Sequence, residues 1–221
     1  MSIQRIDLND QAYDTIKSRL LSREFGPRAK LSLQTLADEL EVSRSPVHHA
    51  LTRLVSEGLV KVNRRGYWVR PLTATLMAET HDVRCAIELF AADRTVRFLA
   101  PAKLALLRER MQATVDLVTN QEFVDKHAFM LANKAFHECI VDLAENATLS
   151  ETYRSLSLHQ LMERALAGTT TEAGNSNDEH RRILEAYEKG SLAEARAAIV
   201  ANVETGKRLA LAMIEASGGV I

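Results

Sequence analysis

The most restrictive feature of this chain is a change of apolar period within residues 33–70. Two short stretches first carry apolar residues at helical spacing: Leu33, Leu36, Ala37 and Leu40, and then Val47, Ala50, Leu51 and Leu54. After Gly58 the period becomes 2, with strand patterns at residues 59–62 and 67–70. We therefore predict two short helices joined by a tight turn and followed by a β-hairpin, which is a winged helix-turn-helix.

Local signals agree with this assignment. Ser32 stands where it can cap the first short helix, and Pro46 falls in the first turn of the second, where a missing N–H costs nothing. A further helical stripe precedes them at residues 10–25, and Pro71 closes the segment. We therefore assign residues 1–72 to an N-terminal winged helix-turn-helix domain.

The net charge of −1 conceals an uneven distribution. Residues 1–72 carry 12 basic and 8 acidic side chains, whereas the remainder carries 16 basic and 21 acidic ones. Within residues 42–72, six basic side chains face Glu57 alone. A basic segment beside an acidic body indicates an anionic partner for one end of the protein, although a solvated charged face would give the same count.

The predicted arrangement suits double-stranded DNA. A single helix fits the major groove, and polar residues on its exposed N-terminal half can reach the base edges. Basic residues at the tip of the hairpin, Arg64 and Arg65, are suited to phosphates or to the neighbouring minor groove. Plain solvent exposure remains the alternative for His48 and His49.

Residues 8–72 resemble the GntR family of bacterial transcription regulators, on the run Val42-Ser43-Arg44-Ser45-Pro46-Val47-His48-His49-Ala50-Leu51 and on Glu57-Gly58-Leu59-Val60 and Arg65-Gly66. The resemblance implies DNA contacts by the residues at the start of the second short helix and by the wing. The full candidate set is Gln34, Arg44, Ser45, His48, His49, Arg64, Arg65 and Gly66. The family usually has Arg-Glu at His48-His49 and often Arg at Gln34, so we expect the same docking with a different operator sequence, because neutral imidazole lacks the two-pronged guanine contact of arginine.

The rest of the chain has helical patterns only. With 9 glycines, 4 prolines and 5% aromatic residues, the composition favours a mainly α protein. We predict helices at 74–98, 101–119, 121–146, 149–167, 177–189 and 191–216, with a polar loop at 169–177 and no strand after Thr73. The fold class is therefore a winged helix-turn-helix followed by an all-helical bundle at residues 73–221.

Polar side chains interrupt the apolar faces of four of these helices. They are Arg84, Glu88, Asn133, His137, His180 and Asn202. Burying an unsatisfied polar group costs about 1–3 kcal/mol, so we expect them to share partners or a purpose. Arg84 keeps its charge and needs an anion if it is buried, either Glu88 or a bound carboxylate. Bundle cores hold ligand and metal sites, and this donor set suits a divalent ion such as zinc.

Residues 74–216 resemble the FadR-type effector domain, called the FCD domain, on Asn133-x-x-Phe136-His137, on the Asp178-Glu179-His180 segment and on the long last helix. Many members of that subfamily hold a metal with one Asp and three His beside a small carboxylate effector. The matching positions here are Asn133, His137, His180 and Asn202, and the first and last differ from the family. The resemblance implies an effector site that includes Arg84 and Glu88, with Asn133, His137 and His180 as metal ligands; a metal-free polar pocket is the alternative.

We therefore expect a ligand-responsive transcription regulator that binds operator DNA as a homodimer, with a small anionic effector. We expect no enzyme, because no Ser or Cys nucleophile is paired with a base. A metal-dependent enzyme and a DNA-binding module with a purely structural dimerisation bundle are the alternatives. Without a membrane-spanning stretch or signal peptide, and with Cys85 and Cys139 as expected core thiols, the chain is expected to be cytoplasmic.

Overall fold

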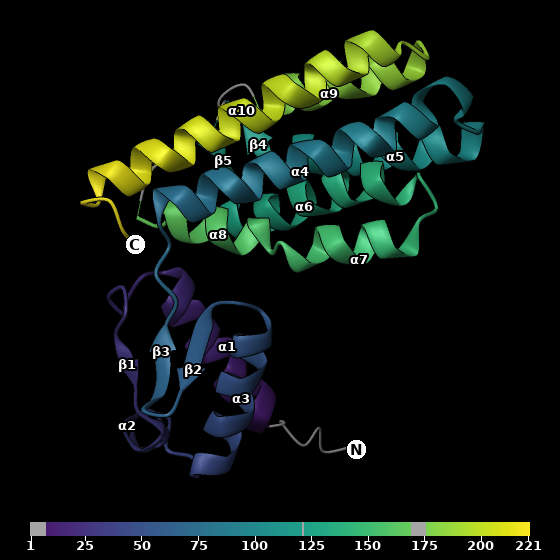
Figure 1. Ribbon diagram of the computed structural model, residues 1–221. Helices are drawn as coiled ribbons and strands as arrows, with labels where there is room; N and C mark the ends of the chain where they lie inside the picture. The colour runs from purple at the N-terminus through teal and green to yellow at the C-terminus, as the bar shows by residue number, and fades with distance from the viewer. Residues whose placement is uncertain (1–7, 121, 169–175) are drawn as a thin grey trace, which may run out of the picture.

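The computed structural model describes residues 8–120, 122–168 and 176–221. Its N-terminal part folds as three helices and a small sheet (Figure 1). The elements in chain order are α1 (Leu8–Leu21), β1 (Lys30–Leu31), α2 (Leu33–Glu39), α3 (Arg44–Ser56), β2 (Val60–Asn63) and β3 (Gly66–Val69). The antiparallel sheet has the order β1-β3-β2, so the predicted winged helix-turn-helix is confirmed. β1 was not predicted, because two residues are too few to show an alternating pattern.

Residue chemistry fixes the ends of these elements. The Ser32 hydroxyl accepts a hydrogen bond from the Thr35 N–H at 3.3 Å and caps α2 as predicted. Gly66 begins β3 with a φ of 113°, a conformation that side chains with a Cβ rarely adopt. The core lies between α1, α3 and the sheet, and its fully buried members include Ile16, Leu20, Leu51 and Leu54.

The C-terminal part is a layered helical bundle. Its elements are α4 (Ala74–Thr95), a 3-10 turn η1 (Val96–Phe98), α5 (Pro101–Val115), β4 (Val118–Thr119), β5 (Glu122–Phe123), α6 (Lys126–Asp142), α7 (Ala147–Ser155), α8 (Leu158–Ala165), α9 (Ser176–Glu188) and α10 (Leu192–Ala216). The two longest helices, α4 and α10, run side by side along one face (Figure 1). Cys139 is buried in this bundle as predicted, whereas Cys85 is only partly buried.

The expectation that no strand follows Thr73 was wrong. The predicted helices at 101–119 and 121–146 are shortened by a hairpin in which β4 pairs with β5, with Val118 opposite Phe123. α5 ends at Val115, with Asp116 as its C-cap. Asn120, directly after β4, has a positive φ of 52°, and Asp125 then caps α6 through the Ala128 N–H. Two-residue strands leave no alternation that a sequence pattern can reveal.

The predicted single helix at 149–167 is two helices. Ser157 has a left-handed φ of 49° and separates α7 from α8. Asn146 caps the start of α7 by accepting a hydrogen bond from the Leu149 N–H at 3.1 Å. The predicted polar loop at 169–177 lies almost wholly outside the described residues.

The two parts meet at a short linker. Leu72 and Ile221 exchange backbone hydrogen bonds of 2.7 and 2.9 Å, so the described C-terminal residues flank the connection into α4. Thr73 caps α4 by accepting from the Leu76 N–H. Among the described residues, no helix has the length and apolar character required to cross a membrane.

Candidate functional site

The predicted DNA contacts lie on the surface of the N-terminal domain. Arg44, Ser45, His48 and His49 are exposed on the first two turns of α3, and Arg64 and Arg65 are exposed at the tip of the wing. Gln34 on α2 is held beside them, because its Oε1 accepts a hydrogen bond from Arg44 Nε at 2.5 Å. The structure thus gathers the predicted residues on the helix-turn-helix and its wing.

Tyr67 on β3 belongs to the same surface and was not among the predicted residues. Its ring lies edge-to-face with that of His48, with centroids 6.1 Å apart, and its hydroxyl lies 3.4 Å from Thr52 Oγ1. It therefore packs the wing against α3. An aromatic residue in a strand carries no separate signal for this role.

The second site is a buried polar cluster in the bundle. Arg84 Nε donates to Glu88 Oε1 at 2.7 Å, and Arg84 Nη2 lies 2.8 Å from His137 Nε2 and 2.9 Å from Asn202 Oδ1. Glu88 Oε2 lies 3.2 Å from His137 Nδ1, and Tyr153 donates its hydroxyl proton to Glu88 Oε1 at 2.6 Å. Three predicted residues therefore surround Arg84, and Glu88 supplies the internal anion that a buried guanidinium requires.

These contacts determine the protonation of the cluster. Although burial opposes charge on both groups, the Arg84 guanidinium holds the pKa of Glu88 far below its usual value, and Glu88 raises the pKa of Arg84. Burial, together with the charge of Arg84, lowers the pKa of His137. A neutral His137 donates from Nδ1 to the carboxylate and accepts at Nε2 from Arg84, so both ring nitrogens are engaged.

His180 and Asn133 take different positions. The His180 ring packs against Phe136 and His137, with centroids 4.6 and 5.2 Å away, and its Nδ1 lies 3.3 Å from Thr114 Oγ1. Burial lowers the pKa of His180 well below its usual value. Asn133 is half-buried and lines a neighbouring cavity, which His180 does not line.

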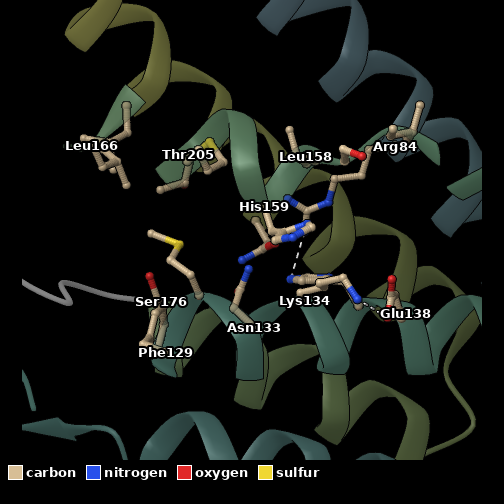
Figure 2. A pocket seen from close by; sticks show the side chains of 18 of the residues that line it. Arg84, Phe129, Asn133, Lys134, Glu138, Leu158, His159, Leu166, Ser176 and Thr205 are labelled. Atoms are coloured by element: carbon tan, nitrogen blue, oxygen red, sulfur yellow. Dashed lines mark hydrogen bonds and ion pairs between the residues drawn. The ribbon is translucent and has the colours of Figure 1, made fainter. Parts of the chain in front are cut away.

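That cavity has a volume of about 120 Å³ and is lined by residues of α4, α6, α7, α8, α9 and α10. Figure 2 shows Arg84, Lys134 and Glu138 toward one end and Phe129 and Leu166 toward the other. The cavity therefore has a polar end beside the Arg84 cluster and a more apolar end. This is the usual construction of a small-molecule site.

The lining also contains residues that were not predicted from the sequence. His159 on α8 lies near the centre of the cavity, beside Asn133 (Figure 2), and burial lowers its pKa to about 4. Lys134 lines the polar end, where it pairs with Glu138 at 2.9 Å. No sequence pattern predicts a role for His159, because its place in the cavity depends on how the backbone break at Ser157 orients α8.

The donor set does not fit a resident metal ion. The lone pair of His137 Nε2 and the oxygen of Asn202 both point to the Arg84 guanidinium, which takes the place that a cation would need. Within the part of the chain that the structure describes, no group of three or more His, Cys, Asp or Glu side chains is arranged to hold a metal. The arrangement favours hydrogen bonding of a polar ligand over coordination.

Comparison with protein families separates the same two parts. Residues 8–69 match the family described as "Bacterial regulatory proteins, gntR family", and residues 79–205 match the family described as "FCD domain". Each match covers one of the two candidate sites.

Curated relatives extend over most of the chain. The HTH-type transcriptional regulator LutR of Bacillus subtilis (strain 168) is 28% identical over 203 residues, which cover 81% of this chain and 90% of that protein. The gluconate operon transcriptional repressor of the same bacterium is 30% identical over 148 residues, which cover 66% of this chain and 58% of that protein.

Solved structures show the same fold. A GntR transcriptional regulator from Rhodococcus sp. RHA1 superposes with a TM-score of 0.70 at 21% identity, covering 92% of this chain and 97% of the other. McbR/YncC from E. coli gives a TM-score of 0.65 at 22% identity, covering 93% and 97%.

Proposed function

This chain belongs to the gntR family of bacterial regulatory proteins and carries an FCD domain, and from that premise we propose that it is a transcription regulator whose affinity for operator DNA responds to a small molecule in the bundle cavity. The observation that carries this proposal is the pairing of an exposed basic α3–wing surface with a cavity in the helical bundle of the same chain. Such a regulator would act in the bacterial cytoplasm, where the DNA lies.

The DNA-binding part is tested by selecting duplexes from a random library with the wild-type protein and measuring their affinity. We expect Arg44→Ala to weaken the selected duplex by about 1–3 kcal/mol and to reduce discrimination between sequences. Arg65→Ala should weaken all duplexes about equally and flatten the salt dependence, as expected for a phosphate contact. Arg108→Ala, on the exposed face of α5, is the control. If Arg44→Ala and Arg65→Ala both bind the selected duplex as tightly as the wild type does, the assigned DNA-binding surface is wrong.

We further propose a two-fold homodimer built on the outer face of α4. A single recognition helix reads too few base pairs for a specific site, and paired half-sites solve this problem. Val83 and Phe90 are each 44% exposed, and Phe98 just beyond the helix is 86% exposed. Exposed apolar side chains gathered on one face are typical of an interaction surface.

Phe90→Asp is expected to shift the protein from dimer to monomer at micromolar concentration, as measured by sedimentation. Leu131→Asp, which changes an apolar residue that is 46% exposed on α6, should leave the dimer intact. A wild-type monomer in the presence and absence of DNA would contradict the proposal.

The proposed effector is a small carboxylate, with its anionic group at the polar end of the cavity near Arg84, Asn133 and Lys134. Three of the five N–H groups of Arg84 serve Glu88, His137 and Asn202, and those on Nη1 remain for Tyr153 and the cavity. The internal Arg84–Glu88 pair is also what a purely structural bundle would contain. The cavity beside this pair favours a ligand-binding site over a purely structural role.

We expect calorimetry with a panel of small carboxylates, including phenylacetate, hexanoate and gluconate, to detect one binder that also changes the DNA affinity. Asn133→Leu should abolish that binding, and Asn177→Leu, outside the cavity lining, should not. Metal analysis of the purified protein should find less than about 0.1 divalent ion per chain, because Arg84 takes the cation position. If no carboxylate of the panel both binds and changes the DNA affinity, the result favours a purely structural bundle.

A further inference from the structure

Helix α8 lies between the cavity and the N-terminal domain and presents a different face to each. Leu158 and Met162 line the cavity. Because successive residues of a helix turn by about 100°, Gln160 and Arg164 lie on another side of α8. There, both side chains contact the N-terminal part of the chain.

The Gln160 contact reaches the end of the recognition helix. Gln160 Nε2 donates a hydrogen bond to Glu57 Oε2 at 2.8 Å, and Glu57 is the C-terminal cap of α3. Lys17 Nζ donates to the same oxygen at 2.8 Å, and the Tyr13 hydroxyl donates to Glu57 Oε1. A displacement of Gln160 therefore acts directly on the junction of α1 and α3.

Two arginines hold the other end of α8. Arg23, between α1 and the sheet, donates to the carbonyl oxygens of Arg164, at 2.5 Å, and Ala165 in the last turn of α8. Arg164 Nη1 donates in return to the Arg70 carbonyl oxygen at 3.0 Å, just before the interdomain linker. Arg164 is only 3% exposed, and its Nη2 also donates to the Ile221 carbonyl oxygen at 3.1 Å, so two backbone acceptors hold its side chain in place.

α8 is also a separate unit within the bundle. It is eight residues long, and the left-handed Ser157, with a φ of 49°, breaks its backbone hydrogen-bond ladder from α7. Ser157 itself lines the cavity. The short helix can therefore change position relative to α7 at this residue without bending a continuous helix.

We propose that α8 carries the state of the cavity to the recognition helix through the Gln160–Glu57 hydrogen bond. This inference rests on the proposed function, because it names the route by which the effector site regulates DNA binding. Protein interiors are close-packed, so a molecule too large for the cavity of about 120 Å³ must move a wall, and α8 is the wall set apart by a backbone break. The ligand regulates DNA binding to the extent that it favours one position of α8 over the other.

A cavity-filling substitution tests the route without a known effector. Thr205→Phe fills the cavity from α10, and the affinity of this variant is measured with the duplex selected by the wild-type protein from a random library. We expect it to change the Kd for that duplex roughly tenfold. In a Gln160→Met background, which removes the bond to Glu57 while retaining side-chain length, the change should fall below about twofold, as a double-mutant cycle reports coupling.

Gln112→Met is the matched control, because Gln112 donates to Asp116 on the exposed face of α5. The route is supported if the tenfold change in Kd caused by the cavity-filling substitution persists in the Gln112→Met background and is lost in the Gln160→Met background. If the tenfold change persists in the Gln160→Met background, the route is overturned and the proposed function stays intact. Failure of the wild-type protein to select any duplex overturns the proposed function itself. If circular dichroism shows Thr205→Phe to be unfolded, Leu209→Trp, which fills the same cavity, replaces it. If neither cavity-filling variant changes the DNA affinity, the route is overturned.

Discussion

Glu88→Gln is expected to lower the free energy of unfolding by about 3–5 kcal/mol, because it leaves a buried arginine charged and without its anion. Glu88 is fully buried, and Arg84 Nε lies 2.7 Å from its Oε1. The same carboxylate also accepts from Tyr153 and lies 3.2 Å from His137 Nδ1. A glutamine amide has the same shape but only one acceptor oxygen, so it cannot satisfy these donors together. Urea unfolding followed by circular dichroism measures the loss.

Two further variants separate charge from shape. Glu188→Gln removes an exposed pair with Arg108 and should cost less than about 1 kcal/mol. Replacing both partners, by Arg84→Met with Glu88→Leu, should recover only part of the loss. No charge then remains buried without a partner, but His137, Asn202 and Tyr153 lose hydrogen bonds to the pair. A loss below about 1 kcal/mol for Glu88→Gln would show that the guanidinium has another anion or reaches solvent.

The sequence predicted the N-terminal domain well because its determinants are local. The helical stripes around residues 33–54, the cap at Ser32 and the glycine at Gly66 each act within a few residues of the chain. The break between α7 and α8 was not predictable in this way. A serine is not an expected left-handed residue, so no local signal predicts the positive φ of Ser157.

The residues of the candidate effector site also divide into those that the sequence predicts and those that it does not. Arg84, Glu88, His137 and Asn202 were expected to share the inside of the bundle from helical spacing, and the structure brings them into one hydrogen-bonded cluster. Spacing could not decide which partner Arg84 selects, because this depends on distances between helices. It also could not place His159, whose direction depends on the turn at Ser157.

Acidification from pH 7 to pH 5 is expected to destabilise the bundle through its buried histidines. His81 on α4 is fully buried, and within the described residues its Nε2 has no hydrogen-bond partner. Burial, aided by the charges of Arg84 and Lys207, lowers the pKa of His81 from 6.5 to about 4. Burial lowers the pKa of His137 and His180 as well.

The direction of the effect follows from proton uptake. Between about pH 6.5 and pH 4 the unfolded chain binds a proton at His81 that the folded protein excludes, so stability is complete above this window and is lost as the pH falls through it. At about 1.4 kcal/mol per pKa unit, His81 alone accounts for about 2 kcal/mol at pH 5 and about 3 kcal/mol at pH 4. Urea unfolding at pH 7 and pH 5 measures this difference. His81→Leu should reduce the loss by about 2 kcal/mol, whereas His49→Leu, on the exposed face of α3, should leave it unchanged. An equal loss in the wild type and in His81→Leu would show that His81 reaches water or a proton acceptor in the folded protein, and that other groups cause the acid sensitivity.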